Sequence, residues 1–252
     1  MKLIYHPFSP FSRKVYMLAL ELNLASSITL QKVVVAPVFY PGWSDNNLDV
    51  SAAGNPLGKI PVLVVDDFAD DDGDGDGNEG DEGKKPVGIF DSKFICEYLL
   101  SRAGRDDGQG KSARTRWLEK SVHGACDGMA DAEILVAYEQ RLRADKGLLY
   151  QAWVDGQREK VTRGFRFLDA VAAAATATAS GLLRPARPDR PASVAEIAAA
   201  TTCAFFDLRD FPWRPLAPSL EAWFEQWKSR PSFELTPPTA QHWFPPPAAE
   251  RL

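Results

Sequence analysis

The chain has 252 residues, 45% of them hydrophobic, which is enough to fill one large core or two modest ones. Residues 66–85 hold ten acids against Lys84 and Lys85, so the rest of the chain, whose total formal charge is -5, carries about +3. No long basic run, no membrane-length apolar run and no signal-peptide pattern is present, which excludes nucleic acid and membrane as expected partners and predicts a cytoplasmic protein.

The first third of the chain predicts a βαβ unit. Residues 2–5 (KLIY) are short and apolar, and the turn-prone HPFSP that follows predicts a strand running into a loop. Ser9 is a good N-cap and Pro10 suits the first helical position, so a helix is expected to begin there. The β-branched residues 28–35 (ITLQKVVV) predict the second strand, and this order is typical of an α/β domain.

Two more strands and a helix follow. Residues 36–58 are rich in Pro, Gly and Asn and predict a loop with one short helix, before a third strand in KIPVLVV. A fourth strand is expected at 87–90 (VGIF), and then a helix over about 92–100. Its expected buried face consists of Phe94, Ile95, Tyr98 and Leu99.

Residues 66–86 separate the third and fourth strands and predict a disordered acidic insertion, because their Asp and Gly content cannot bury apolar surface. The alternation of Asp with Gly also suggests a calcium loop. An EF-hand, however, requires a glutamate at its twelfth position and flanking helices, whereas strands flank this segment. Cys96, Cys126 and Cys203 form no CxxC pair, so we expect buried thiols and no metal site.

From residue 111 the periodicity is helical throughout. GRDDGQG at 104–110 predicts a linker between a domain at 1–103 and an all-helical domain at 111–252. Ser193 and Glu196 in SVAEI form the pattern of a capping box. Helices are expected at 111–143, 149–179, 193–209 and 217–229.

Two motifs carry a resemblance to a known family. NPLGKIPVL at 55–63 and DSKFICEYL at 91–99 resemble the glutathione site of the glutathione S-transferases, and SPFSRKV, the SVAEI box and a penultimate helix ending in RPSF match that family in order. The chain departs from it at the acidic insertion, at Glu196, where many members have Asp, and in having Ser rather than Tyr or Cys in the first helix. The resemblance implies a thioredoxin-like α/β domain followed by an all-α domain.

The resemblance also implies a set of glutathione-binding residues. It makes Pro61 cis, which turns the Ile60 N–H and C=O toward the cysteinyl unit of glutathione. Ser92 is assigned to the γ-glutamyl carboxylate, Asp91 to the α-ammonium group and Lys59 to the glycyl carboxylate. From the residues alone, Ser92 is also explained as a helix cap and Lys59 as a solvated surface lysine.

Ser9 is the first candidate for activating the glutathione thiol. A thiolate requires a hydrogen-bond donor and a positive helix end, and Ser9 supplies both, although it is equally explained as a simple cap. Tyr5 is the second candidate donor, since other classes of the family use a tyrosine there; its alternative role is core packing. Arg13 either adds positive potential or lies on the surface.

The implied function is a glutathione transferase in which glutathione, as co-substrate, attacks a small hydrophobic electrophile. Two alternatives stay open: a non-catalytic binding or regulatory module of the same fold, and a glutathione-dependent isomerase or dehalogenase. The resemblance further implies a homodimer and a role in detoxification.

Overall fold

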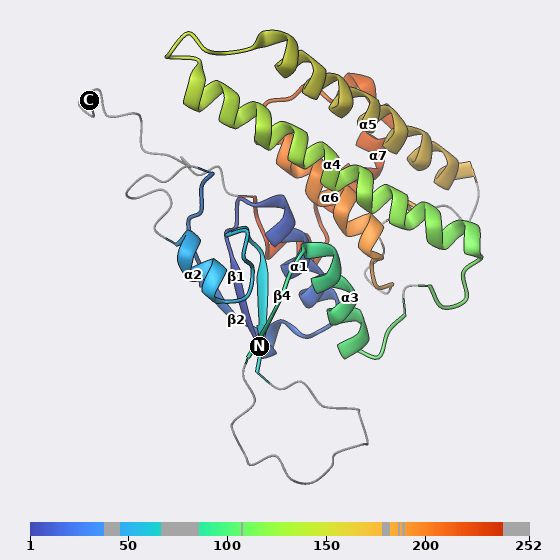
Figure 1. The fold of residues 1–252 in the computed structure, drawn as a ribbon. Helices are drawn as coiled ribbons and strands as arrows, with labels where there is room; N and C mark the ends of the chain where they lie inside the picture. The colour runs from blue at the N-terminus through green and yellow to red at the C-terminus, as the bar shows by residue number, and fades with distance from the viewer. Residues whose placement is uncertain are drawn as a thin grey trace. The chain divides into compact units, whose positions relative to one another are not determined.

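The computed structural model describes residues 1–37, 46–66, 86–106, 108–177, 182–185, 187 and 190–238. Two compact units divide the chain, one containing Met1–Ala103 and the other Gly104–Thr239 (Figure 1). Residues 67–85, which make up nearly all of the predicted acidic insertion and of the weighed calcium loop, lie outside the described residues. The predicted organisation, an α/β unit followed by a helical unit, is confirmed.

A four-stranded mixed sheet forms the centre of the first unit, with the strand order β2-β1-β3-β4. β1 pairs in parallel with β2 and antiparallel with β3, and β3 pairs antiparallel with β4. α1 connects β1 to β2 through the short helix η1, which completes the predicted βαβ unit. The bounds are β1 (Lys2–Tyr5), α1 (Pro10–Glu21), η1 (Ala25–Ser27), β2 (Thr29–Lys32), β3 (Val62–Val65) and β4 (Val87–Ile89).

The second strand is shorter than the predicted 28–35. Its backbone leaves the sheet where the N–H of Val34 donates to Oδ1 of Asn46 at 3.0 Å. Ala36 is held in the same way, because its N–H and C=O bond the side-chain amide of Asn47. These amides belong to the start of α2 (Asn47–Ala52), the short helix expected in this loop.

Apolar residues alternate between the two faces of the sheet, as the two-residue period of strands requires. Ile4, Val62 and Val64 pack in one cluster with Val50 of α2. On the other face, α1 contacts α3 (Ser92–Arg102), and α3 contacts β3. Figure 1 shows α2 on one side of the sheet and the pair α1 and α3 on the other.

The prediction that Phe94 lies on the buried face of α3 is wrong, because its side chain is 57% exposed. Tyr98 is only partly buried. The buried stripe instead runs through Ser92, Ile95, Cys96, Leu99 and Leu100, which recur at three- and four-residue spacing. Phe94 falls outside that stripe, so its hydrophobicity misled the sequence assignment.

The second unit contains helices only. α4 contacts α5 and α6, and α7 contacts both α5 and α6. Its core is aromatic: the ring of Phe165 stacks on Trp213 with centroids 5.2 Å apart and meets Phe206 edge-on at 5.1 Å. The bounds are α4 (Ala113–Arg143), α5 (Gln151–Ala177), α6 (Val194–Asp207), η2 (Arg214–Leu216), α7 (Pro218–Trp227) and α8 (Pro231–Glu234).

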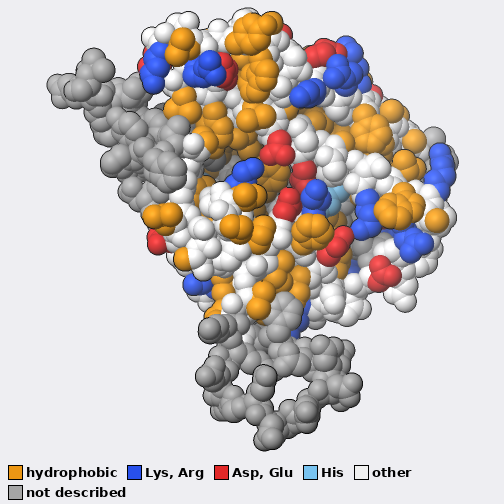
Figure 2. Space-filling model, viewed as in Figure 1, with side chains coloured by type: hydrophobic (Ala, Val, Ile, Leu, Met, Phe, Trp, Pro, Cys, Tyr) orange, Lys and Arg blue, Asp and Glu red, His pale blue; other side chains and the backbone are white. Residues whose placement is uncertain are grey.

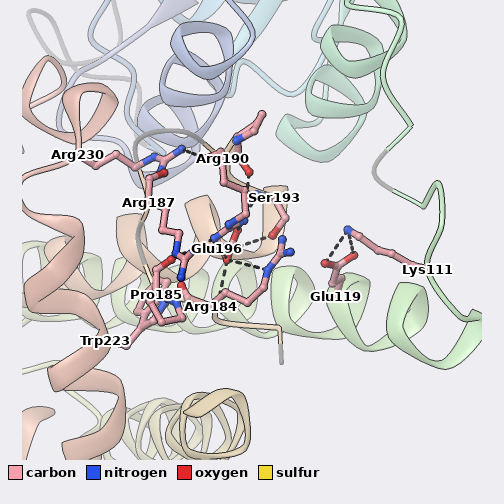
Figure 3. A network of polar contacts seen from close by, with 11 residues as sticks. Lys111, Glu119, Arg184, Pro185, Arg187, Arg190, Ser193, Glu196, Trp223 and Arg230 are labelled. Carbon is pink, nitrogen blue, oxygen red and sulfur yellow. Dashed lines mark hydrogen bonds and ion pairs between the residues drawn. The ribbon is translucent and has the colours of Figure 1, made fainter. Parts of the chain in front are cut away.

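The predicted capping box opens α6. The Ser193 hydroxyl accepts from the N–H of Glu196, and Glu196 Oε2 accepts from the N–H of Ser193 at 2.8 Å. Glu196 is fully buried and also receives both terminal nitrogens of Arg190, at 2.9 and 2.7 Å (Figure 3). Arg230 donates to the carbonyls of Arg187 and Arg190, so the same network fixes the described part of the segment before α6.

The cysteines, the helices and the surface each agree with or limit an expectation from the sequence. All three cysteines are buried free thiols, as expected. None of the helices described has the length and hydrophobicity of a membrane span. Within the described ranges no group of three His, Cys, Asp or Glu side chains is placed to hold a metal ion. Acidic, basic and hydrophobic side chains are interspersed on the face seen in Figure 2.

Candidate functional site

The three predicted site segments leave the sheet at one end. β1 runs toward this end and stops at Tyr5, β4 stops there at Ile89, and β3 begins there at Val62. The registers pair Ile4 with Val62 and Leu63 with Ile89. Continuing them by one residue in β1 and two in β4 places Tyr5 and Asp91 on either side of Pro61. Residues that lie 56 positions apart (Tyr5 and Pro61) and 30 positions apart (Pro61 and Asp91) in the sequence are therefore neighbours.

The segment before β3 has the predicted geometry, because the Ile60–Pro61 peptide bond is cis. Buried Asn55 organises the loop that leads to it. Its side-chain Nδ2 donates to the carbonyl of Lys59 at 2.7 Å, and its own carbonyl accepts from Gly58, whose φ of 61° is left-handed. Among the residues that the structure describes, the N–H and C=O of Ile60 have no hydrogen-bond partner. Ile60 itself is half-buried.

At the start of α3 the structure corrects one interpretation of the sequence. Asp91, not Ser92, is the N-cap, and its Oδ1 accepts from the N–H of Lys93 at 2.9 Å. Ser92 is the first helical residue, is buried, and donates its hydroxyl to the same Oδ1 at 3.2 Å. Asp91 remains exposed, so its carboxylate faces solvent beside a helix N-terminus. The Phe90–Asp91 bond is also cis.

Ser9 caps α1 as predicted. Its Oγ accepts from the N–H of Ser12 at 3.3 Å, and Pro10 occupies the first turn. Because the oxygen serves the cap as an acceptor, the hydroxyl proton is directed away from Ser12. Ser9 is 5% exposed. The cap and a donor function are therefore compatible in one side chain, at the positive end of a twelve-residue helix.

Tyr5, the second candidate donor, ends β1. Its ring lies 6.4 Å from that of Tyr16, centroid to centroid. Burial, and to a lesser extent the nearby Tyr16, raises the pKa of the Tyr5 phenol. The phenol therefore stays protonated at neutral pH, which makes it a possible hydrogen-bond donor and a poor base.

The two candidate cations differ in their surroundings. Lys59 is exposed and follows Gly58 in the loop before Ile60. Arg13 is buried, so the surface alternative for it is wrong, and burial lowers the pKa of its guanidinium to about 9. Arg13 lies four residues after Ser9 in α1, on the same helical face, and donates its N–H to the Ser9 carbonyl.

The sequence assigned no role to His6, which the structure places in the loop between β1 and Ser9. Its side chain is buried, and its Nδ1 accepts from the N–H of Phe8 at 3.2 Å. In the sequence it belongs only to the turn-prone HPFSP. The signal available there was a side-chain acceptor two residues before an N–H donor, which is the spacing of an Asx-turn.

Comparisons with known proteins agree with the fold. Residues 8–102 match the family described as "Glutathione S-transferase, N-terminal domain". A glutathione transferase family member from Pseudomonas fluorescens Pf-5, solved with bound glutathione, is 28% identical with a TM-score of 0.72, and the match covers 94% of this chain and 98% of that one. A glutathione S-transferase from Methylobacillus flagellatus KT, also with glutathione bound, is 25% identical with a TM-score of 0.67, over 94% and 99%.

A comparison with curated protein sequences finds no match. The domain match and the likeness to solved transferases extend from the thioredoxin-like sheet through the helical unit. Together they identify residues 8–102 as a glutathione S-transferase N-terminal domain and give the chain the fold of the solved transferases.

Proposed function

We propose that this chain is a glutathione transferase that binds glutathione with residues 1–103 and presents its thiolate to a small hydrophobic electrophile. The observation that carries the proposal is the convergence, at one end of the sheet, of the cis Ile60–Pro61 segment, the Asp91–Ser92 helix start and the strand that leads to Ser9. Bound glutathione in the Pseudomonas and Methylobacillus structures supports the same ligand here.

Each part of glutathione has a complementary group in this arrangement. The N–H and C=O of Ile60 suit the cysteinyl backbone as a strand-like partner. The N-terminus of α3, with Ser92, suits the γ-glutamyl carboxylate. Asp91 retains a second carboxylate oxygen, Oδ2, for the α-ammonium group, since its bonds to Ser92 and Lys93 use Oδ1. Exposed Lys59 pairs with the glycyl carboxylate.

The chemical step follows from stabilising the thiolate. A free thiol has a pKa of about 8.5 and is mostly protonated at neutral pH. A hydrogen bond from the Ser9 hydroxyl and the positive end of α1 favour the anion, so the proton is released to water. The sulfur then attacks the electrophilic carbon, a C–S bond forms, and the displaced pair goes to the leaving group or the adjacent acceptor atom. Serine forms no mixed disulfide, which disfavours thiol transfer.

Substitution of Ser9 tests the donor. Charge-assisted hydrogen bonds contribute about 1.5–3 kcal/mol, so Ser9→Ala is expected to raise the pKa of the bound thiol by about one to two units. The ultraviolet absorbance of the thiolate against pH reports this value, calorimetry reports the glutathione Kd, and a panel of electrophiles reports turnover. Ser101→Ala, an exposed serine of α3, is the matched control.

The outcomes separate the alternatives. An unchanged thiol pKa in Ser9→Ala transfers the role to Tyr5, which Tyr5→Phe then tests. Turnover of isomerisable or halogenated substrates alone indicates the isomerase or dehalogenase. Folded protein that binds no glutathione indicates the non-catalytic module and refutes the proposal. Sedimentation of the same protein tests the homodimer that the family resemblance implies.

A further inference from the structure

The loop that carries Ser9 is held by three hydrogen bonds in which His6 is a donor or an acceptor. The Ser9 N–H donates to the His6 carbonyl at 3.0 Å, which is the bond of a β-turn, and Pro7 occupies the turn position that proline favours. The Phe8 N–H donates to His6 Nδ1 at 3.2 Å. The His6 N–H donates to the Ser12 hydroxyl at 3.4 Å.

These bonds account for the loop's backbone donors. Pro7 has no N–H, and those of His6, Phe8 and Ser9 all donate within the loop or to the first turn of α1. All three bonds use His6, through its backbone N–H, its carbonyl and its ring. Because any residue supplies the carbonyl, the specific contribution of histidine is the ring acceptor for Phe8.

That contact defines the state of the ring. Nδ1 can accept a hydrogen bond only when it carries no proton, so this contact requires the imidazole form whose proton is on Nε2. His6 is only 6% exposed, and this burial holds its ring beside Phe8. A buried N–H that loses its acceptor is destabilised by about 1–3 kcal/mol, which is enough to favour another loop conformation.

We propose that His6 is a positioning residue: its Nδ1 fixes the Phe8 N–H and so holds the Ser9 hydroxyl where it meets the glutathione sulfur. The inference rests on the proposed function and adds to it the group that sets the donor's position. Ser9 directly follows Phe8, so a change in the Phe8 peptide plane turns the Ser9 backbone and its Oγ. Displacements of about 0.5 Å suffice to weaken such contacts.

The roles of ring volume and ring acceptor can be separated by two variants. His6→Phe keeps an aromatic ring and removes the acceptor. His6→Asn removes the ring but restores an acceptor that reaches the N–H two residues ahead, as in an Asx-turn. His123→Phe, which removes another buried imidazole, in α4, is the matched control.

Three measurements on the full chain test these variants, with glutathione as the ligand and an electrophile from the same panel as the second substrate. We expect His6→Phe to raise the bound thiol pKa by about one unit and to lower kcat about tenfold at a pH below that pKa, with the glutathione Kd changing less than about threefold. We expect His6→Asn to restore most of both values. In the free protein, hydrogen exchange at the Phe8 amide should accelerate in His6→Phe and not in His6→Asn.

Three outcomes would contradict the proposed role of His6. A His6→Phe protein with faster Phe8 exchange and an unchanged thiol pKa overturns the inference and leaves the transferase proposal standing. If His6→Asn is impaired as much as His6→Phe, the acceptor role is wrong. A wild-type protein that binds glutathione without lowering its thiol pKa refutes the proposed function, and the role of His6 with it.

Discussion

Glu196 offers the sharpest test of what stabilises the helical unit. It is fully buried, and its carboxylate accepts from the N–H groups of Ser193 and Arg184 and from both terminal nitrogens of Arg190. Glu196→Ala removes every one of these acceptors, breaks the capping box and leaves the Arg190 guanidinium without its carboxylate (Figure 3).

The magnitude follows from those contacts. Removing one partner of a fully buried ion pair destabilises by about 3–5 kcal/mol. Arg190 is 21% exposed and can turn toward water, which reduces this term to about 2 kcal/mol. Loss of the reciprocal cap adds about 1 kcal/mol. We therefore expect Glu196→Ala to lower the free energy of unfolding by about 3 kcal/mol, and Glu196→Gln, which keeps one acceptor, by less.

Urea unfolding followed by tryptophan fluorescence suits the measurement, because Trp213, Trp223 and Trp227 are buried in this unit. Glu159→Ala serves as the control, since its ion pair with Arg163 is exposed and should contribute less than about 0.5 kcal/mol. If Glu196→Ala lowers the free energy of unfolding by less than about 1 kcal/mol, the reasoning is refuted, because the buried network would then contribute little to stability.

Three further outcomes are expected. Gly88→Ala should lower the free energy of unfolding by about 2 kcal/mol or more in a denaturant titration, because a Cβ at this position collides with the Ala53 carbonyl oxygen. Gly124→Ala in α4, where a Cβ meets open space, should raise it by about 0.5–1 kcal/mol. Equal effects of the two variants would contradict this packing. Asp169 in α5 accepts from two N–H groups at the start of α7, so Asp169→Ala should lower the free energy of unfolding by about 1–2 kcal/mol, as measured by calorimetry. An unchanged Tm would show that this cap does not stabilise the protein. Burial raises the pKa of the Cys203 thiol, so alkylation at pH 8 should be slow until urea is added; rapid labelling of folded protein would contradict its burial.

Local rules account for what the sequence predicted correctly. Ser9 before Pro10 and Ser193 before Glu196 are helix starts whose hydrogen bonds close within three residues, so the pattern alone determines them. Three of the four strands are short apolar runs next to turn residues, and the second is indicated by the β-branched residues of 28–35, although it is shorter than that range. Ile60–Pro61 was assigned cis through its motif, and the structure confirms it.

The errors came from contacts that the local pattern does not encode. Phe94 is hydrophobic and was expected in the core, but the neighbours of α3 bury the opposite stripe of that helix. Arginine is seldom buried, which favours a surface position for Arg13, yet this residue is 5% exposed. The contact of His6 with the Phe8 N–H has the spacing of an Asx-turn, but that spacing does not determine how the ring is oriented.

The hairpin of β3 and β4 has an electrostatic consequence for the acidic segment. Val65 pairs with Val87, so the chain departs toward residues 67–85 and returns at the end of the sheet opposite to Pro61. Four residues of strand separate the two ends, about 13 Å at 3.3 Å per residue. Counterions at physiological ionic strength attenuate a field within about 8 Å. The two junctions of this anionic segment thus lie more than one screening length from Pro61, the residue beside which we propose that the negatively charged tripeptide binds.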